Sequence, residues 1–128
     1  VDAELDGLLG RLPGRKHIYT NGTVRHATRI LDAFGIRHHF DFMFDIVASD
    51  HIPKPDPQPY DLFVRQSGIV PETSVMIEDM ARNLEPAANL GMQTIWLVSD
   101  HDWAAKGAEN NFVHFISADV KQCLADLT

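Results

Sequence analysis

Apolar and polar positions alternate along the chain in blocks whose period changes between that of a helix and that of a strand. Leucines recur at helical spacing over the first twelve residues, and Pro13-Gly14 ends the predicted helix. His17–Tyr19 is a short run typical of a strand. Thr23 can then cap a helix that Gly35 ends. The apolar positions of this helix are Val24, Ala27, Ile30, Leu31 and Phe34.

The same alternation continues to the C-terminus. Aromatic residues lead into a predicted strand at 45–48, and a helix ended by Gly68 follows a proline-rich loop at 49–57. The remaining predictions are strands at 75–79, 93–98 and 112–116, helices at about 83–90 and 118–127, and a polar loop with one helical turn at 100–111.

Strands that alternate with helices predict βαβ units and hence an α/β fold with a Rossmann-like, doubly wound, parallel sheet. The 128 residues contain no internal repeat and no low-complexity stretch. This length corresponds to one domain. We therefore expect residues 1–128 to form a single domain.

Composition narrows the classes of function. With 45% hydrophobic and 23% charged residues, the chain resembles an ordinary globular protein. The net charge of −7 argues against nucleic-acid binding, and no apolar run is long enough to span a membrane. The one cysteine, Cys123, fits a reducing compartment, so we expect a cytoplasmic protein with a buried thiol.

Two adjacent carboxylates, Glu78 and Asp79, end the apolar run Val75-Met76-Ile77. We expect this run to be a strand buried on both faces. Ligands of open α/β sheets bind outside the carboxyl ends of the strands, and Mg²⁺ is usually held by one or two carboxylates with water and phosphate. Glu78 and Asp79 are therefore candidate Mg²⁺ ligands. The alternative is a solvated pair that caps the following helix.

Polar residues also follow the other predicted strands. Thr20 and Asn21 end the first strand, and Ser49 and Asp50 end the second. Because the carboxyl ends of parallel strands share one edge of a sheet, we expect them near one crevice. The Thr20 hydroxyl and the N–H groups that follow it could donate to phosphate oxygens. The alternative is that Thr20 only begins a turn with Asn21-Gly22.

Lys54 lies between Pro53 and Pro55 in the loop after the second predicted strand. Flanking prolines stiffen the backbone and lower the entropy cost of presenting one side chain in a fixed direction. A lysine at this edge could neutralise charge that develops on a transferring phosphoryl group. The alternative is the solvated surface position that most lysines occupy.

The seven histidines include the adjacent pair His38-His39 but no i, i+4 pair on one helix. Since no zinc-type spacing occurs, we expect them to be surface or turn residues. Trp96 is predicted in the core, whereas Trp103 lies in a polar segment and suits a partner contact or a loop anchor.

The ordered motifs resemble those of the haloacid dehalogenase-like (HAD) hydrolase superfamily. An apolar strand ends in Thr20, Lys54 lies in Lys-Pro-Asp-Pro-x-x-Tyr, and Ile77-Glu78-Asp79 precedes a helix. These are similar to the second, third and fourth motifs of the family, and the likeness covers nearly the whole chain. The amino-acid sequence of the segments 19–22, 44–47 and 78–84 is similar to that of bacterial pyrimidine 5′-nucleotidase-type members of the family.

The resemblance implies a Mg²⁺-dependent phosphatase that acts through an aspartyl-phosphate on a small phosphate ester, a nucleoside 5′-monophosphate. Thr20 and the N–H of Asn21 would bind the phosphoryl group. Lys54 would bridge that group and the nucleophilic carboxylate. Glu78 and Asp79 would hold Mg²⁺.

Two departures from the family pattern qualify these roles. Asn83 falls where many relatives carry a second Asp, and the first motif, Asp-x-Asp-x-[Thr/Val], has no counterpart upstream of Thr20. We therefore expect the C-terminal portion of a longer enzyme, without its nucleophile strand and cap and without turnover of its own. The alternative is a non-catalytic α/β module. A sheet without its central strand would pair with another chain, for example as a homodimer.

Overall fold

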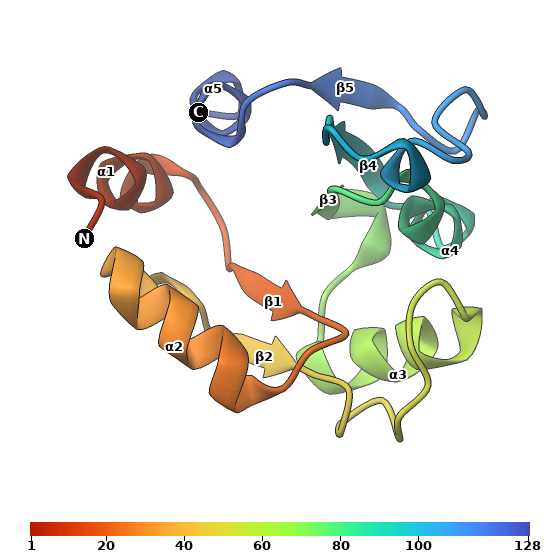
Figure 1. Cartoon of the computed structure of the whole chain (residues 1–128). Helices are drawn as coiled ribbons and strands as arrows, with labels where there is room; N and C mark the ends of the chain where they lie inside the picture. Colours follow the sequence, from red (N-terminus) through yellow and green to blue (C-terminus); the bar gives the residue numbers. More distant parts are fainter. The chain divides into compact units, whose positions relative to one another are not determined.

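The computed structural model describes all 128 residues and shows an α/β chain in which every paired strand runs parallel to its neighbour (Figure 1). The residues form two compact units, 1–53 with 121–128, and 54–120. The helices are α1 (Ala3–Arg11), α2 (Val24–Phe34), α3 (Pro57–Ser67), α4 (Glu85–Asn89) and α5 (Val120–Asp126). The strands are β1 (His17–Tyr19), β2 (Phe42–Phe44), β3 (Val75–Glu78), β4 (Gln93–Leu97) and β5 (Phe115–Ser117).

The first unit contains a two-stranded sheet in which Ile18 of β1 pairs with Met43 of β2. Helix α2 starts and stops at the expected residues, because local groups satisfy its ends. Thr23 accepts the N–H of His26 at the start of α2, and Gly35 ends that helix in the left-handed region at φ 73°. The predicted bounds of β1 and α2 and the end of α1 before Pro13-Gly14 are therefore confirmed, whereas α5 is shorter than the predicted 118–127.

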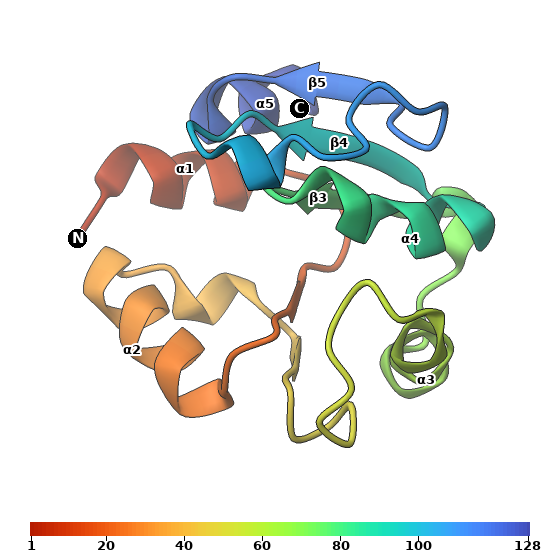
Figure 2. The ribbon, with the colours of Figure 1, turned by 45° about the vertical axis from the view of Figure 1, so that its right-hand side comes forward.

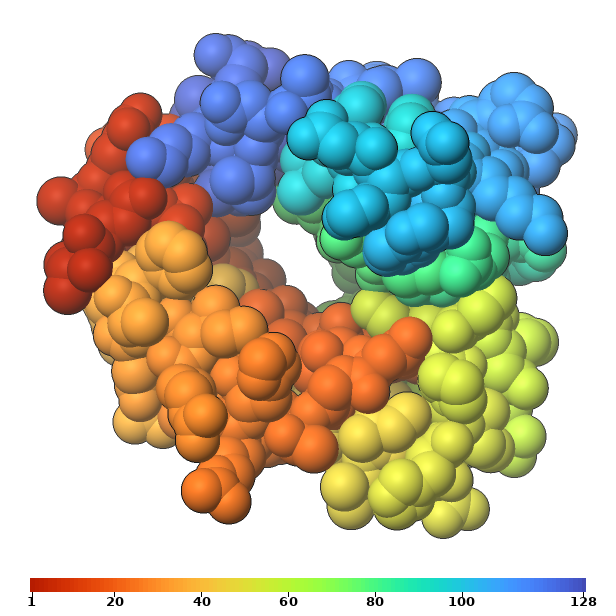
Figure 3. Space-filling model, viewed as in Figure 1, coloured from red at the N-terminus to blue at the C-terminus, as the bar shows by residue number.

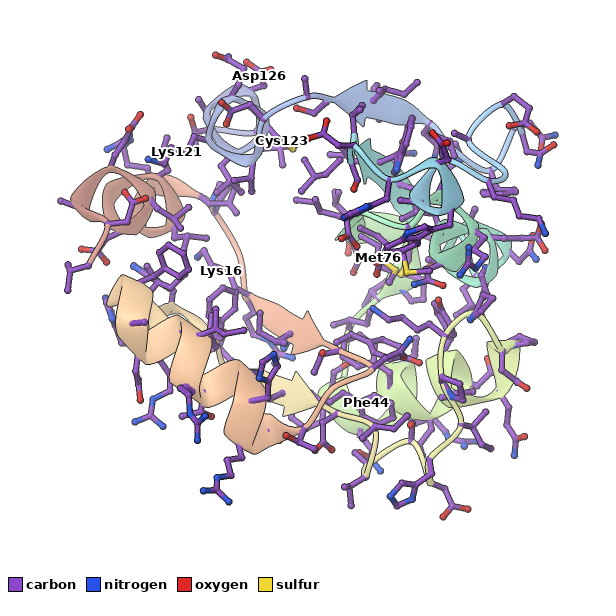
Figure 4. All side chains as sticks on the ribbon, in the orientation of Figure 1. Lys16, Phe44, Met76, Lys121, Cys123 and Asp126 are labelled. Atoms are coloured by element: carbon purple, nitrogen blue, oxygen red, sulfur yellow. The ribbon has the colours of Figure 1, made fainter.

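The last helix, α5, carries Lys121 and Cys123 (Figure 4). Lys121 Nζ lies 3.0 Å from Asp2 Oδ2 and 3.2 Å from Glu4 Oε2, so it joins α5 to the start of α1. The thiol of Cys123 is buried, as predicted.

The second strand lies earlier than the prediction of residues 45–48. Phe44, which is fully buried, ends β2 (Figure 4), and residues 46–51 form turns. The physical reason is Asp45, whose Oδ2 accepts the N–H of Val24 and whose Oδ1 accepts that of Ala48, both at 2.9 Å. This side chain turns the backbone away from the ladder, so Ser49 and Asp50 do not end a strand.

Replacing Asp45 by Ala should destabilise the first unit by about 1–3 kcal/mol, because two part-buried N–H groups would lose their acceptor. Burial raises the pKa of Asp45, but the N–H groups of Ala48 and Val24 outweigh it and hold the pKa below its ordinary 3.8. Urea unfolding measures the change, with Asp61→Ala on α3 as an exposed control. Equal stability of the two variants would contradict the capping role.

The second unit contains a three-stranded sheet in the order β3-β4-β5, whose strands lie side by side (Figure 2). Ile77 of β3 pairs with Ile95 of β4, which pairs with Phe115 of β5. Helix α3 begins at Pro57 behind the Asp56 cap and ends at Gly68, as predicted. The buried cluster of this unit consists of Ala81, Leu84, Trp96 and Phe112. The prediction that Trp96 is a core residue is thus confirmed.

Two expectations for predicted strands are wrong. Strand β3 is half-buried rather than covered on both faces, since it is an edge strand paired only with β4. Strand β5 begins three residues later than predicted. The Thr94 hydroxyl donates a hydrogen bond to the Phe112 carbonyl and accepts one from the His114 N–H, so these backbone groups are not paired with another strand. Helix α2 buries only one apolar side chain, and its outer face lies at the surface (Figure 3). The exposed apolar residues of that face are Val24, Ile30 and Phe34.

The remaining differences concern the segment after β3 and the number of sheets. The chain first forms a 3₁₀ turn, Ala81–Leu84, and then the short α4, so regular α-helix begins later than the predicted residue 83. The α/β class and the parallel pairing are confirmed, but the strands form two hydrogen-bonded sheets. That the chain is one domain stays a prediction.

Candidate functional site

A buried ammonium–carboxylate pair lies at the end of β3. Lys54 Nζ is 2.7 Å from Glu78 Oε2, and the side chains are only 6% and 9% exposed. Removing two charges from water is costly, and such pairs are weak stabilisers compared with apolar packing. The surface alternative for Lys54 is therefore wrong, and the fixed ammonium suits a functional site better than a stabilising one.

The backbone around Lys54 is held by the start of α3. Asp56 Oδ1 accepts the N–H of Gln58, which fixes the first turn of the helix two residues after Lys54. Tyr60 is buried, and its hydroxyl donates to the backbone carbonyl of Asn83. The loop with Lys54 is thereby tied to the segment that follows Glu78-Asp79.

The turn after β3 presents the two carboxylates differently. Glu78 Oε1 accepts the N–H of Met80 at 3.3 Å, while Trp96 Nε1 donates to the carbonyl of Asp79 at 2.9 Å. The Asp79 side chain is exposed, and no side chain caps the 3₁₀ turn that follows. The interpretation of this pair as a helix cap is therefore wrong.

Burial raises the pKa of Glu78 above its ordinary 4.5, and the nearby ammonium of Lys54 only partly opposes this. A hydrogen bond with the Asp79 side chain raises the pKa further. The carboxyl group of Glu78 therefore takes up a proton more readily in the folded chain than in the unfolded chain.

The raised pKa of Glu78 predicts a specific pH dependence of stability. Because the folded state binds this proton at higher pH than the unfolded chain, the stabilising contribution is complete below pH 4.5 and is lost as the pH rises through the folded pKa. In Glu78→Gln the contribution is absent. The free energy of unfolding, measured with urea, should therefore fall more between about pH 4 and about pH 8 in the wild type than in Glu78→Gln. The exposed control Glu109→Gln should show the same fall as the wild type. Parallel curves for wild type and Glu78→Gln would contradict the prediction.

An open hollow of about 470 Å³ lies at the carboxyl ends of the strands in the second unit. Asp79 lines it after β3, and Ser99, Asp100 and His101 line it after β4. The sequence pattern predicts only a polar loop there, so it misses the last three residues. A usable signal exists, because Asp100 follows an apolar strand as Asp79 does.

Thr20 and Asn21 follow β1 in the first unit, where Thr20 Oγ1 accepts the N–H of Gly22 at 2.9 Å. The turn expected as the alternative is therefore present. A threonine hydroxyl can accept and donate at once, so the O–H is still able to donate to a phosphate oxygen. That Thr20 shares a site with Lys54, Glu78 and Asp79 stays a prediction.

The donor set of the second unit fits Mg²⁺, which prefers carboxylate, carbonyl and water oxygens. Both oxygens of Glu78 already accept hydrogen bonds, whereas Asp79 is exposed. Asp79 is therefore the residue that would hold the ion directly, and Glu78 would reach it through a water molecule. Asn83 provides a further oxygen atom in this unit, because its Oδ1 is buried without a hydrogen-bond partner. Such an oxygen needs a donor or a cation.

Comparison with known proteins shows the family to which the chain belongs. The haloacid dehalogenase-like hydrolase family matches residues 8–91, so the chain belongs to that family. The chain is 38% identical over 74 residues to the bifunctional epoxide hydrolase 2 of Sus scrofa, covering 58% of this chain and 13% of that protein.

Solved structures share the fold. An L-2-haloacid dehalogenase from Xanthobacter autotrophicus, with chloropropionic acid covalently bound, superposes at a TM-score of 0.73 and 16% identity, covering 96% of this chain and 59% of that one. A mutant HAD-family enzyme from Bacteroides thetaiotaomicron, in complex with magnesium and inorganic phosphate, superposes at 0.61 and 22% identity, covering 78% and 54%. The chain therefore spans a little more than half the length of these structures. None of its helices combines the length and apolar composition that a bilayer crossing requires.

Proposed function

We propose that this HAD-family hydrolase is a Mg²⁺-dependent phosphomonoesterase, with Lys54, Asp79 and Glu78 in its active site. The observation that carries the proposal is the buried ammonium of Lys54, fixed 2.7 Å from Glu78 beside the exposed carboxylate of Asp79. The magnesium and phosphate in the Bacteroides thetaiotaomicron relative support the same chemistry.

Each residue has a separate task in this proposal. The Lys54 ammonium attracts the phosphoryl oxygens and stabilises charge that grows on them during transfer. Glu78 holds Lys54 in place, and Asp79 binds Mg²⁺. When bound, the ion neutralises phosphate charge and orients the ester. The family motif also assigns phosphate binding to the Thr20 hydroxyl and the N–H of Asn21, which lie in the first unit.

The nucleophile must come from outside these residues, since no Asp-x-Asp pattern stands upstream of Thr20. We infer a reaction in which an Asp carboxylate of such a motif attacks phosphorus and displaces the alcohol of the ester. Water then hydrolyses the aspartyl-phosphate, which releases phosphate and restores the carboxylate. The 128-residue chain should accordingly show no turnover above background. The substrate we propose is a nucleoside 5′-monophosphate with a pyrimidine base, on the likeness of residues 19–22, 44–47 and 78–84 to pyrimidine 5′-nucleotidases.

The test is a phosphatase screen of the full-length natural protein against nucleoside monophosphates, sugar phosphates and a general phosphate ester, with and without Mg²⁺. Mg²⁺-dependent release of phosphate, fastest from pyrimidine nucleotides, is the expected result. Release from sugar phosphates alone would overturn the nucleotide assignment. A gene that encodes no Asp-x-Asp strand before Thr20 would overturn the catalytic one.

A second candidate is a non-catalytic module that pairs with another copy of the chain. The observation that favours it is the edge of β3, which pairs on one side only and has Val75 44% exposed. Unpaired edges can add a strand from another chain. Sedimentation of the purified chain would show a concentration-dependent dimer if this candidate is right and a monomer if it is wrong.

A further inference from the structure

A group of metal-binding side chains in the first unit has no part in the proposed phosphatase site. Asp6 lies on α1, and His38 and His39 lie on the 3₁₀ turn Arg37–His39. Asp6 Oδ1 is 2.6 Å from His39 Nε2 and 3.2 Å from His38 Nε2. One ligand atom of each residue lies within 4.8 Å of the others. Two imidazoles and one carboxylate thus converge on one point.

The backbone holds the two sides of this group together. The N–H of Asp2, before α1, donates to the carbonyl of Phe34 at the end of α2. Gly35 then reverses the chain, and the N–H of Ile36 donates to Leu31, which places the 3₁₀ turn beside α1. The ring of His39 packs against α1 at Gly10, where an added Cβ would lie 3.7 Å from Cε1. The fold therefore brings together the two backbone segments that carry these side chains before any ion binds.

The chemistry of the group suits zinc rather than magnesium. Imidazole nitrogen and carboxylate oxygen are the usual zinc ligands, at about 2.0–2.2 Å, so ligands around one ion lie roughly 3.3 Å apart. The 3.2 Å between Asp6 and His38 already matches this spacing. His39 lies closer, at a hydrogen-bond distance, and would need to move by less than about 1 Å. Magnesium prefers sites made of oxygen alone.

We propose that Asp6, His38 and His39 bind one divalent transition-metal ion of the zinc class, with water as the remaining ligand. The ion joins α1 to the 3₁₀ turn after α2 and stabilises the first unit. The histidine spacing in the sequence does not predict this site, because the carboxylate comes from 32 and 33 residues away. Only the packing of α1 against the turn brings the three together.

The experiment titrates the natural protein with Zn²⁺ near neutral pH by competition with a chromogenic chelator. Excess Mg²⁺ is present to occupy sites made of oxygen ligands. We expect one zinc ion per chain at this site, and Asp6→Asn or His38→Ala should each weaken binding by at least about tenfold. The exposed His26→Ala on α2 is the matched control and should bind as the wild type does.

Two further readouts keep the outcome decisive. His38 is 65% exposed, so His38→Ala tests the ligand without disturbing the core. In NMR spectra, Zn²⁺ should shift the imidazole resonances of His38 and His39 but not those of His26. Equal zinc affinity in wild type, Asp6→Asn and His38→Ala, or unshifted His38 and His39 resonances, would overturn the proposal. Neither result would bear on the phosphatase assignment.

Discussion

Replacing Asp79 by Asn should lower the phosphatase turnover of the full-length protein by about 100-fold or more while leaving the protein folded. The exposed side chain of Asp79 makes no helix cap, so the isosteric amide costs little stability, but it removes the charge that would hold Mg²⁺ in the proposed site. Turnover is measured on a general phosphate ester at saturating Mg²⁺. Circular dichroism of the same samples reports whether the fold is intact.

Lys54→Ala should cause a loss of turnover of similar size, because the ammonium acts on charge that develops in the transition state. This variant also leaves Glu78 buried without its partner, so it is assayed well below its melting temperature. Asp61→Asn removes an exposed carboxylate from the same unit and is the matched control. Turnover near the wild-type rate in either Asp79→Asn or Lys54→Ala would refute the proposed site.

Replacing Trp96 by Ala should destabilise the second unit by about 3–5 kcal/mol, the usual cost of removing a large core aromatic. Trp96 is 8% exposed and packs with Ala81, Leu84 and Phe112. Urea unfolding measures the change. Trp103→Ala is the matched control, because Trp103 is 52% exposed and stacks only on the ring of His101. Similar losses for the two variants would contradict the assignment of Trp96 to the core.

Trp96→Phe separates packing from the hydrogen bond to the Asp79 carbonyl. Phe keeps most of the ring but has no N–H, so we expect a stability loss of about 1 kcal/mol beyond the lost volume. The turn with Glu78 and Asp79 would lose one of its fixed contacts. In the full-length enzyme this should lower turnover less than Asp79→Asn does.

The bounds of α2 and α3 were predictable because the signals are local. Thr23 and Asp56 cap helices within three residues of themselves, and Gly35 and Gly68 adopt the left-handed conformation that ends them. The positions of β2 and β5 were not predictable. The end of β2 and the start of β5 depend on the side chains of Asp45 and Thr94. These side chains accept hydrogen bonds from the N–H groups of Val24 and His114, which are about 20 residues away in the sequence.

Some features of the candidate site also follow from local sequence, whereas others depend on the folded structure. The order of Thr20, Lys54 and Glu78-Asp79 along the chain was enough to indicate the family that the comparison then showed. The sequence left open whether Lys54 is solvated and whether Glu78-Asp79 caps a helix. Burial of Lys54 against Glu78, 24 residues away, answers the first question. The uncapped turn after β3 answers the second.

The α/β class, the ends of α2 and the phosphate-site candidates follow from the amino-acid sequence, because caps, glycine stops and strand-end motifs act over a few residues. Which charged side chains meet depends on the packing of the folded chain. The ion pair of Lys54 with Glu78 depends on packing between segments far apart in the chain, which no local pattern encodes. The same holds for the convergence of Asp6 with His38 and His39. Burial then raises the pKa of Glu78, a property that its position in the sequence does not contain.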